Sequence, residues 1–98
     1  MSLPLVFQAG VRGEIDDAYQ WYERQREGLG EEFLLEVEAA LARIARDPEL
    51  HAIVHREVRR GRLSRFPYSA YYRIESEPIT VLAIRHAKRD PSSWRSEA

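Results

Sequence analysis

The chain has 98 residues, 44% of them hydrophobic and 32% charged, a balance that fits one globular domain over residues 1–98 and argues against intrinsic disorder. It contains no cysteine, which excludes a disulfide framework, a thiolate zinc site and a cysteine nucleophile. No apolar run reaches the roughly 18 residues of a membrane span, and the first residues do not resemble a signal peptide, so we expect a cytoplasmic protein without membrane association.

The net charge of −1 conceals a strong asymmetry between the two halves of the chain. Residues 1–50 carry five Arg or Lys and eleven Asp or Glu, whereas residues 51–98 carry ten and five. This division predicts an anionic partner for the second half, or a fold in which acidic helices lie against a basic sheet. Both interpretations can hold together.

The first half of the sequence predicts a strand followed by an amphipathic helix. Leu3–Phe7 is a short apolar run, typical of a strand, and Gln8-Ala9-Gly10 breaks it. Trp21 lies at the flank of the helical stripe, where it covers the edge of the core or contacts a partner. The stripe itself repeats at helical spacing and contains Val11, Ile15, Ala18, Tyr19 and Tyr22.

A second helix is expected after the tight connection Gly28-Leu29-Gly30. Glu31 and Glu32 place negative charge in its first turn, which complements the helix dipole, and Asp47-Pro48 ends it. The three-residue connection predicts an antiparallel helical hairpin. The buried stripe of the second helix is predicted to contain Phe33, Leu34, Val37, Leu41, Ile44 and Ala45.

After Pro48 the apolar period changes to two, which is typical of strands. Pro67 lacks a backbone N–H and therefore marks an edge, a bulge or a break between strands, and Glu75-Ser76-Glu77-Pro78 forms a turn. Short connections favour an antiparallel meander, so we predict an α+β fold in which a helical hairpin packs on a curved, mainly antiparallel sheet. The extended segments are predicted at residues 54–59, 63–66, 68–75 and 79–86.

Alternation along the last two strands assigns their side chains to faces. Tyr72 falls on the more apolar side and is predicted to lie in the core, whereas Tyr71 and Arg73 are predicted to face outward. Leu82, Ile84 and His86 are predicted to share a face, opposite the face of Val81, Ala83 and Arg85. His86 is therefore in line with apolar neighbours, and is either a buried structural histidine or a catalytic one.

Arginines and aromatic residues are interleaved on these strands. Guanidinium groups pair with phosphate or carboxylate, and aromatic faces stack on bases or pack in cores. A basic sheet face of this kind needs nucleic acid, an acidic protein or the acidic half of the chain itself as its partner. The candidate residues for binding a target or nucleic acid are Arg59, Arg60, Arg62, Tyr71, Arg73 and Lys88.

The chemistry that these residues could perform is metal-free phosphodiester cleavage. Such a reaction needs a proton donor or acceptor, for which His86 is suited, and positive charge around the phosphorane. Arg65, Arg85 and Arg89 could supply that charge. No recognised metal signature or phosphate loop is present, so we expect no metal and no cofactor.

The ordered set of motifs resembles a known family over nearly the whole chain. The motifs are Ala18-Tyr19-Gln20-Trp21-Tyr22-Glu23, Gly28-Leu29-Gly30-Glu31-Glu32-Phe33, Arg65-Phe66-Pro67-Tyr68, Tyr71-Tyr72-Arg73-Ile74, Arg85-His86, Arg89-Asp90-Pro91 and Trp94. This order resembles the RelE/ParE superfamily, the toxin half of bacterial type II toxin–antitoxin modules. The resemblance implies the element order β-α-α-β-β-β and a co-expressed antitoxin. Members either cleave ribosome-bound messenger RNA or inhibit DNA gyrase without nuclease activity.

Two departures from the nucleolytic members favour a ParE-like branch. Those members carry an arginine three residues before the tyrosine that is here Tyr72, and this chain has Ser69 at that position. They also often end soon after the last strand, whereas Arg89-Asp90-Pro91 and Trp94 follow His86 here. The resemblance thus predicts a toxin that binds DNA gyrase. The alternatives are a ribosome-dependent, metal-free mRNA endoribonuclease that uses His86, Arg85, Arg65 and Arg89, and an inactive interaction module.

An antitoxin partner is expected for any of these targets. Its segment is predicted to lie, extended or helical, against the sheet edge and the helical hairpin, with acidic residues meeting the arginines. Exposed Trp21, Leu29 and Phe66 are predicted to mark the antitoxin-binding groove. The sequence leaves open whether the protein also forms a homodimer.

Overall fold

The computed structural model describes residues 2–88 and contains two α-helices and five strands within them. The predicted α+β fold, a helical hairpin on a mainly antiparallel sheet, is confirmed. In chain order the elements are β1 (Leu5–Phe7), α1 (Val11–Gln25), α2 (Leu29–Arg46), the short 3₁₀ helix η1 (Pro48–Leu50), β2 (Ile53–His55), β3 (Val58–Arg62), β4 (Tyr68–Ile74) and β5 (Ile79–His86).

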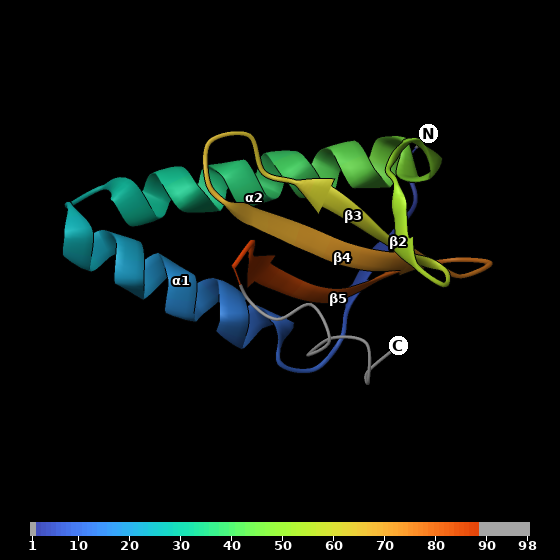
Figure 1. Ribbon diagram of the computed structural model, residues 1–98, viewed down its shortest axis with the longest axis horizontal. Helices are drawn as coiled ribbons and strands as arrows, with labels where there is room; N and C mark the ends of the chain where they lie inside the picture. The colour runs from blue at the N-terminus through green and yellow to red at the C-terminus, as the bar shows by residue number, and fades with distance from the viewer. Residues whose placement is uncertain (1, 89–98) are drawn as a thin grey trace.

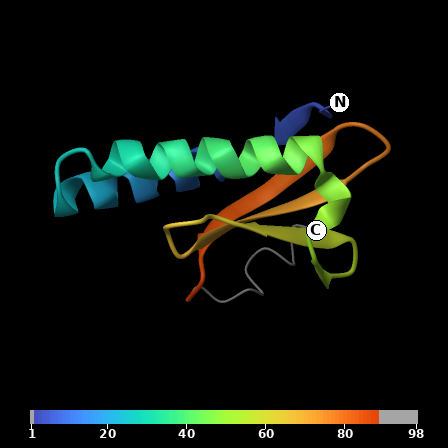
Figure 2. The same cartoon turned by 90° about the horizontal axis from the view of Figure 1, so that it is seen from above.

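The strands form one sheet in the order β1-β5-β4-β3-β2 (Figure 1). Neighbouring strands are antiparallel, except that β1 runs parallel to β5 at the outer edge. The two helices lie side by side and cover one face of the sheet, which gives two layers when the molecule is seen from above (Figure 2). Strand β5, the last one within residues 2–88, is therefore an inner strand between β1 and β4.

The structure corrects two of the predicted extended segments. The segment at residues 54–59 is two strands, because Arg56 adopts a positive φ of 50° in a turn that separates β2 from β3. The segment at residues 63–66 is a loop, in which the Leu63 N–H donates to the Tyr68 carbonyl oxygen at 3.0 Å. The break that Pro67 predicts is confirmed, and so is the turn at residues 75–78.

The main core lies between the helices and the sheet. Phe33 and Ile44 of α2 and Tyr72 of β4 are fully buried in it. Tyr22, Phe33, Phe66 and Tyr68 form an aromatic cluster, in which the Phe66 ring centroid lies 4.9 Å from that of Tyr22 and 5.4 Å from that of Phe33. The prediction that Phe66 is exposed is therefore wrong, since its side chain closes this cluster and is only 8% exposed.

A β-bulge in β5 changes the predicted assignment of side chains to faces. Tyr71 pairs with Ala83 but Tyr72 pairs with Val81, so Leu82 is the extra residue. Leu82 and Ala83 both belong to a small cluster with Val58 and Tyr71, separate from the main core. The prediction that Leu82 shares a face with Ile84 is wrong, because the bulge resets the alternation and Ile84 packs in the main core.

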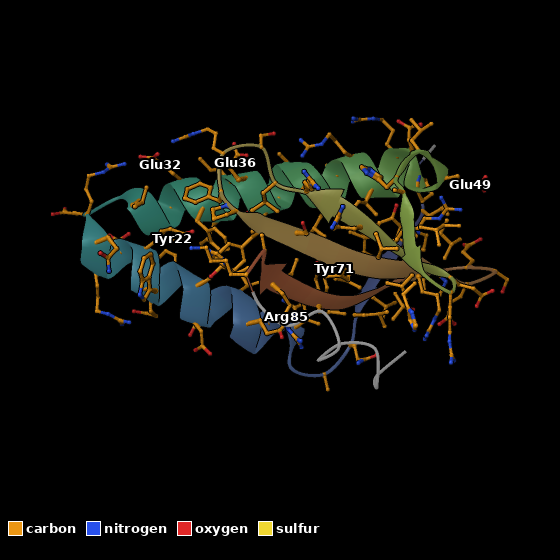
Figure 3. All side chains as sticks on the ribbon, in the orientation of Figure 1. Tyr22, Glu32, Glu36, Glu49, Tyr71 and Arg85 are labelled. Carbon is orange, nitrogen blue, oxygen red and sulfur yellow. The ribbon has the colours of Figure 1, made fainter. Side chains whose placement is uncertain are left out.

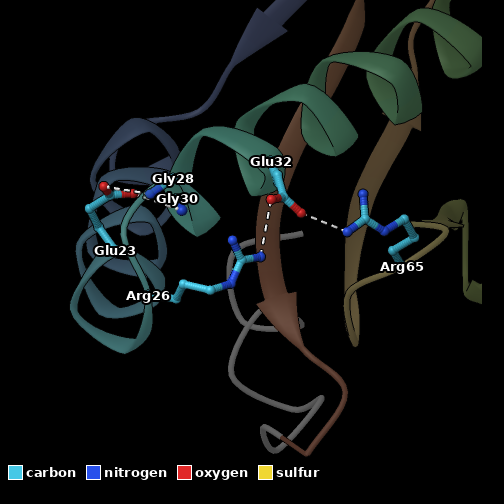
Figure 4. A network of polar contacts seen from close by, with 6 residues as sticks. All are labelled: Glu23, Arg26, Gly28, Gly30, Glu32 and Arg65. Carbon is cyan, nitrogen blue, oxygen red and sulfur yellow. Dashed lines mark hydrogen bonds and ion pairs between the residues drawn. The ribbon is translucent and has the colours of Figure 1, made fainter.

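The helical hairpin is closed by a carboxylate from α1 (Figure 4). Glu23 accepts hydrogen bonds from the backbone N–H groups of Gly28 and Gly30, each at 2.9 Å, and so satisfies two donors that the start of a helix leaves without an intrahelical partner. Gly28 has φ 89°, a left-handed conformation that favours glycine. With these donors satisfied, α2 already begins at Leu29, inside the predicted connection.

Substitution of Gly30 by alanine is expected to destabilise the protein by about 1 to 3 kcal/mol. A Cβ atom at this position would lie 2.8 Å from the Tyr19 carbonyl oxygen and 2.8 Å from Glu23 Oε1, so the two helices would have to separate. Urea denaturation followed by circular dichroism measures the loss. Gly13→Ala is the matched control, because nothing lies within 4 Å of its added Cβ and helix propensity favours alanine. Equal stability of the two variants would contradict this account of the close approach.

His51 and Tyr72 connect η1 to the sheet. The Tyr72 hydroxyl donates to the Pro48 carbonyl oxygen at 2.5 Å, and burial raises the pKa of Tyr72 to about 12. The His51 ring packs edge-on against Tyr72, with 6.0 Å between centroids. Burial first, and then the charges of Arg43 and Arg59, lower the pKa of His51 from its ordinary value of 6.5.

This lowered pKa predicts a loss of stability in mild acid. Unfolded His51 takes up a proton near pH 6.5 while the folded form resists protonation, so protons favour the unfolded state as the pH falls below that value. We expect the His51→Gln variant to lose less stability than the wild type between pH 7 and pH 5, as measured by urea denaturation at each pH. Identical pH profiles for wild type and His51→Gln would refute the assignment.

Candidate functional site

Two hollows lie on opposite sides of the Pro67–Tyr68 segment, which contributes to both. We call the first the basic hollow, a cavity of about 290 Å³. We call the second the Trp21 groove, a cavity of about 620 Å³. The basic hollow is lined by Arg60, Arg62, Leu63, Phe66, Pro67, Tyr68, Ser69, Tyr71 and Ala87, and the Trp21 groove by Glu14, Asp17, Ala18, Trp21, Tyr22, Pro67, Tyr68, Ile84 and His86.

The position of β3 against α2 determines where the arginines of the basic hollow point. A Cβ atom on Gly61 would lie 2.8 Å from Ile44 Cδ1, so this residue faces the helices. Because side chains alternate along a strand, Arg60 and Arg62 face away from the helices. Across the sheet, Arg60 pairs with Tyr71 and Arg62 with Ser69. The sequence predicted both arginines as binding candidates, and the register of β3 and β4 places them on the same face of the sheet, in one hollow.

Tyr71 does not project into solvent as predicted. It lies on the face of the sheet away from the helices (Figure 3), but its side chain is only 8% exposed because it packs with Val58, Leu82 and Ala83. The outward face predicted for this tyrosine is therefore correct, but little of the ring is exposed and available for base stacking. Tyr71 forms part of the floor of the basic hollow.

The remaining candidates for target binding lie elsewhere. The Arg59 guanidinium donates to the carbonyl oxygens of Glu49 and His51, at 3.1 and 2.8 Å, and so holds η1 against β3. Arg73 forms an ion pair with Glu75 at 3.0 Å beyond the far end of the hollow. Lys88 is exposed at the end of the described chain, next to His86.

The candidate catalytic residues are not gathered in one place. Arg85 is almost fully buried in an ion pair with Glu14 beside the start of α1 (Figure 3), whereas Arg65 pairs with Glu32 of α2 at 2.7 Å. His86 lies in the Trp21 groove, with its ring centroid 5.2 Å from that of Tyr68. Arg89 falls outside the described residues, as does Trp94.

Arg65, from the basic second half of the chain, forms an ion pair with Glu32, from the acidic first half (Figure 4). Glu32 lies between Arg65 and Arg26, at 2.7 and 3.1 Å. The hydrogen bond from Arg65, followed by that from Arg26, lowers the pKa of the Glu32 carboxyl. The backbone N–H of Arg65 also donates to Glu36, at 3.3 Å, so this loop is fastened to α2 by two carboxylates.

Sequence reasoning missed Glu14, which completes the outer edge of the sheet. Strand β1 pairs with β5 only as far as Val81. Beyond that point the Glu14 side chain, instead of a strand, accepts a backbone hydrogen bond from β5. One carboxylate oxygen accepts from the Ile84 N–H at 2.9 Å and the other from the Arg85 guanidinium. The two contacts span 70 and 71 residues of sequence, so no local pattern could have revealed them.

The Trp21 groove runs between α1 and the end of the β4–β5 pair. Trp21 is 51% exposed at the flank of the helical stripe, as predicted, and stands edge-on to Tyr22 with 5.1 Å between centroids. Burial, and then proximity to Tyr68, raise the pKa of Tyr22. Leu29 is half-buried and packs against the main core rather than lining this groove.

No cluster of three or more metal-ligating side chains occurs among residues 2–88. Neither helix in this part of the chain is long and apolar enough to cross a membrane.

Comparison with known proteins agrees with the fold. Residues 5–91 match the model of a family described as the ParE toxin of the type II toxin–antitoxin system parDE. Toxin ParE2 of Mycobacterium tuberculosis, in strains CDC 1551 / Oshkosh and ATCC 25618 / H37Rv, is 28% identical over 98 residues, which cover 99% of this chain and 93% of the relative. A solved structure of the chromosomal ParDE TA system from P. aeruginosa has the same fold, with a TM-score of 0.72 and 20% identity over 87% of this chain and 96% of that chain. The family match, over most of the sequence, confirms the resemblance to the RelE/ParE superfamily, and the chain belongs to the ParE toxin family of type II toxin–antitoxin systems.

Proposed function

We propose that this toxin arrests growth by binding DNA gyrase through the basic hollow, without covalent chemistry, and that a cognate antitoxin neutralises it. The observation that carries the proposal is the pair Arg60 and Arg62. Neither forms an ion pair with a carboxylate within residues 2–88, although both lie on β3 and line the basic hollow beside apolar side chains. Arginines held in this way recognise carboxylates or phosphates on a partner.

The distribution of the candidate catalytic groups supports a binding role. A nuclease needs its proton donor, its acceptor and its positive charges within hydrogen-bond reach of one phosphate. Here the Arg85 guanidinium is occupied by Glu14, the Arg65 guanidinium by Glu32, and His86 opens into the other hollow. The guanidinium groups of Arg85 and Arg65 are thus each paired with a carboxylate, and Arg65 lies away from the groove that holds His86, which supports binding rather than cleavage.

The second candidate function is ribosome-dependent cleavage of messenger RNA. The same basic hollow favours it, because two guanidinium groups beside a buried tyrosine suit an RNA phosphate as well as a protein carboxylate. In this case the ribosome would have to supply or reposition the catalytic groups.

Induced expression in bacteria that lack the antitoxin separates these functions. Growth, incorporation of labelled amino acids and plasmid supercoiling are followed together after induction. Growth arrest with relaxed or damaged DNA and early translation intact is the result expected for a gyrase-binding toxin. Rapid arrest of translation, abolished by His86→Ala but kept by His55→Ala, would establish the nuclease instead. Normal growth with abundant folded protein would indicate an inactive interaction module and overturn both proposals.

For the antitoxin, we propose that its segment covers both hollows and the helical hairpin beside them. Trp21 is the most exposed aromatic side chain among residues 2–88 and lies next to the Pro67–Tyr68 segment. A segment laid over this region would cover Arg60 and Arg62 at the same time and so prevent target binding. Phe66, being buried, could contribute only as support beneath this surface.

A further inference from the structure

The Trp21 groove is separate from the basic hollow and differs from it in chemistry. Its walls are the side chains of Trp21, Tyr22, Pro67 and Tyr68, and its floor contains Ala18 and Ile84. Three aromatic rings and a proline from α1 and the β3–β4 region therefore surround a volume of about 620 Å³. This volume is large enough for a long side chain and part of its backbone.

The polar groups of the groove leave one carboxylate without an internal partner. Both oxygens of Glu14 are taken, one by the Ile84 N–H and the other by Arg85. His86 accepts the Lys88 backbone N–H through Nδ1 at 3.0 Å, which leaves Nε2 as its other polar atom. Asp17 is exposed and forms no hydrogen bond or ion pair with other residues in the described part of the chain.

We propose that the Trp21 groove receives a cationic side chain, an arginine by preference, from the partner protein. A guanidinium is flat, weakly hydrated and able to stack on aromatic faces while it donates to a carboxylate. An apolar side chain would leave the exposed Asp17 carboxylate beside it without a partner, and an acidic side chain would be repelled by that carboxylate. Of these three classes, only a cationic side chain both stacks on the aromatic rings and pairs with the Asp17 carboxylate.

The arrangement of the two hollows indicates that the occupant belongs to a polypeptide segment. Pro67 and Tyr68 line both, so a segment that crosses them meets the groove on one side and Arg60 and Arg62 on the other. Such a segment carries an arginine for the groove and a carboxylate for the basic hollow. That this segment belongs to the antitoxin rests on the proposed function, whereas the preference of the groove for a cation does not.

The test titrates the ¹⁵N-labelled protein with N-acetyl-arginine amide and, separately, with its neutral isostere N-acetyl-citrulline amide. The probe is expected to bind weakly and to shift the resonances of Asp17, Trp21 and His86 in a saturable way, with the citrulline compound weaker. Asp17→Asn is expected to weaken arginine binding by about two- to fivefold, the range for an exposed ion pair. Asp16→Asn is the matched control, because it removes the same charge one residue away, where the side chain lines a different hollow with Tyr19 and Leu34.

Equal shifts by the two probes, or equal weakening in the Asp16 and Asp17 variants, would overturn the proposal, since the binding would then not depend on charge at this groove. The proposed function can fail independently of this result. A chain that binds the arginine probe at Asp17 but stops no growth keeps its cation-binding groove and loses the assigned toxicity. A chain that stops growth but shows no preference for the arginine probe remains a toxin and loses the cation-binding groove.

Discussion

Replacement of Glu14 by alanine is expected to lower the free energy of unfolding by about 3 kcal/mol. The substitution leaves the Arg85 guanidinium almost buried without its counter-charge, and the Ile84 N–H without its acceptor. Removal of one partner from a buried ion pair costs more than the pair itself contributes, because the remaining charge has lost its hydration. Urea denaturation at pH 7, followed by circular dichroism, measures the change.

The comparison with milder variants tests this explanation. Glu14→Gln keeps an acceptor for Ile84 but not the charge, and is expected to lose less stability than Glu14→Ala. The Glu14→Leu/Arg85→Met double variant has neither charge. Its free energy of unfolding is expected to be higher than that of Glu14→Ala, because no unpaired charge remains buried. Asp16→Ala, on the exposed side of α1, is the control and should remain within about 0.5 kcal/mol of wild type. If Glu14→Ala were as stable as that control, the edge of β5 would not depend on this carboxylate.

Reversal of the two charges in the basic hollow is expected to have the largest effect on function. In the Arg60→Glu/Arg62→Glu variant an anionic surface on the target meets repulsion where it met two donors, and we expect target affinity to fall by at least about 100-fold. The expected outcome in cells is loss of growth arrest with normal amounts of folded protein. Plating efficiency after induction measures the effect, and circular dichroism verifies the fold.

The matched control reverses two arginines on the helical layer. In Arg24→Glu/Arg46→Glu the net charge changes by the same amount, but both side chains are exposed on α1 and α2, away from the hollow. This variant is expected to remain toxic. Loss of toxicity in both double variants would point to long-range steering by net charge rather than to contacts in the hollow.

The helices and the general architecture were accessible from the sequence because their signals are local. Helical spacing from Val11 onward, the glycines around Leu29 and the stop at Asp47-Pro48 each act within a few residues, and the observed helices follow them. The strand β5 was predicted with its observed bounds for the same reason, since a β-branched apolar run follows the turn that ends at Pro78.

The parts that escaped prediction depend on contacts between distant segments. The bulge at Leu82 depends on how β4 and β5 pair. Because of it, the Leu82 and Ile84 side chains lie on opposite faces of the sheet. Phe66 directly follows the polar residues Ser64 and Arg65 in the sequence, yet its side chain is buried in the aromatic cluster. For the site, the sequence identified Arg60, Arg62 and Trp21 as candidates but not their division between two hollows, which requires the position of the Pro67–Tyr68 segment.

The parallel pairing of β1 with β5 has a consequence for the order of folding. The helical hairpin and the β3-β4-β5 meander join neighbouring segments, whereas closing the outer edge joins Glu14 to Ile84 across 70 residues. Loop closure over that distance carries an entropic penalty that is recovered only once both segments are in place, so we expect this edge to form after the folding transition state. Weakening it would then accelerate unfolding and leave the folding rate nearly unchanged, so the lifetime of the folded toxin is governed by the edge where β1 and Glu14 meet β5.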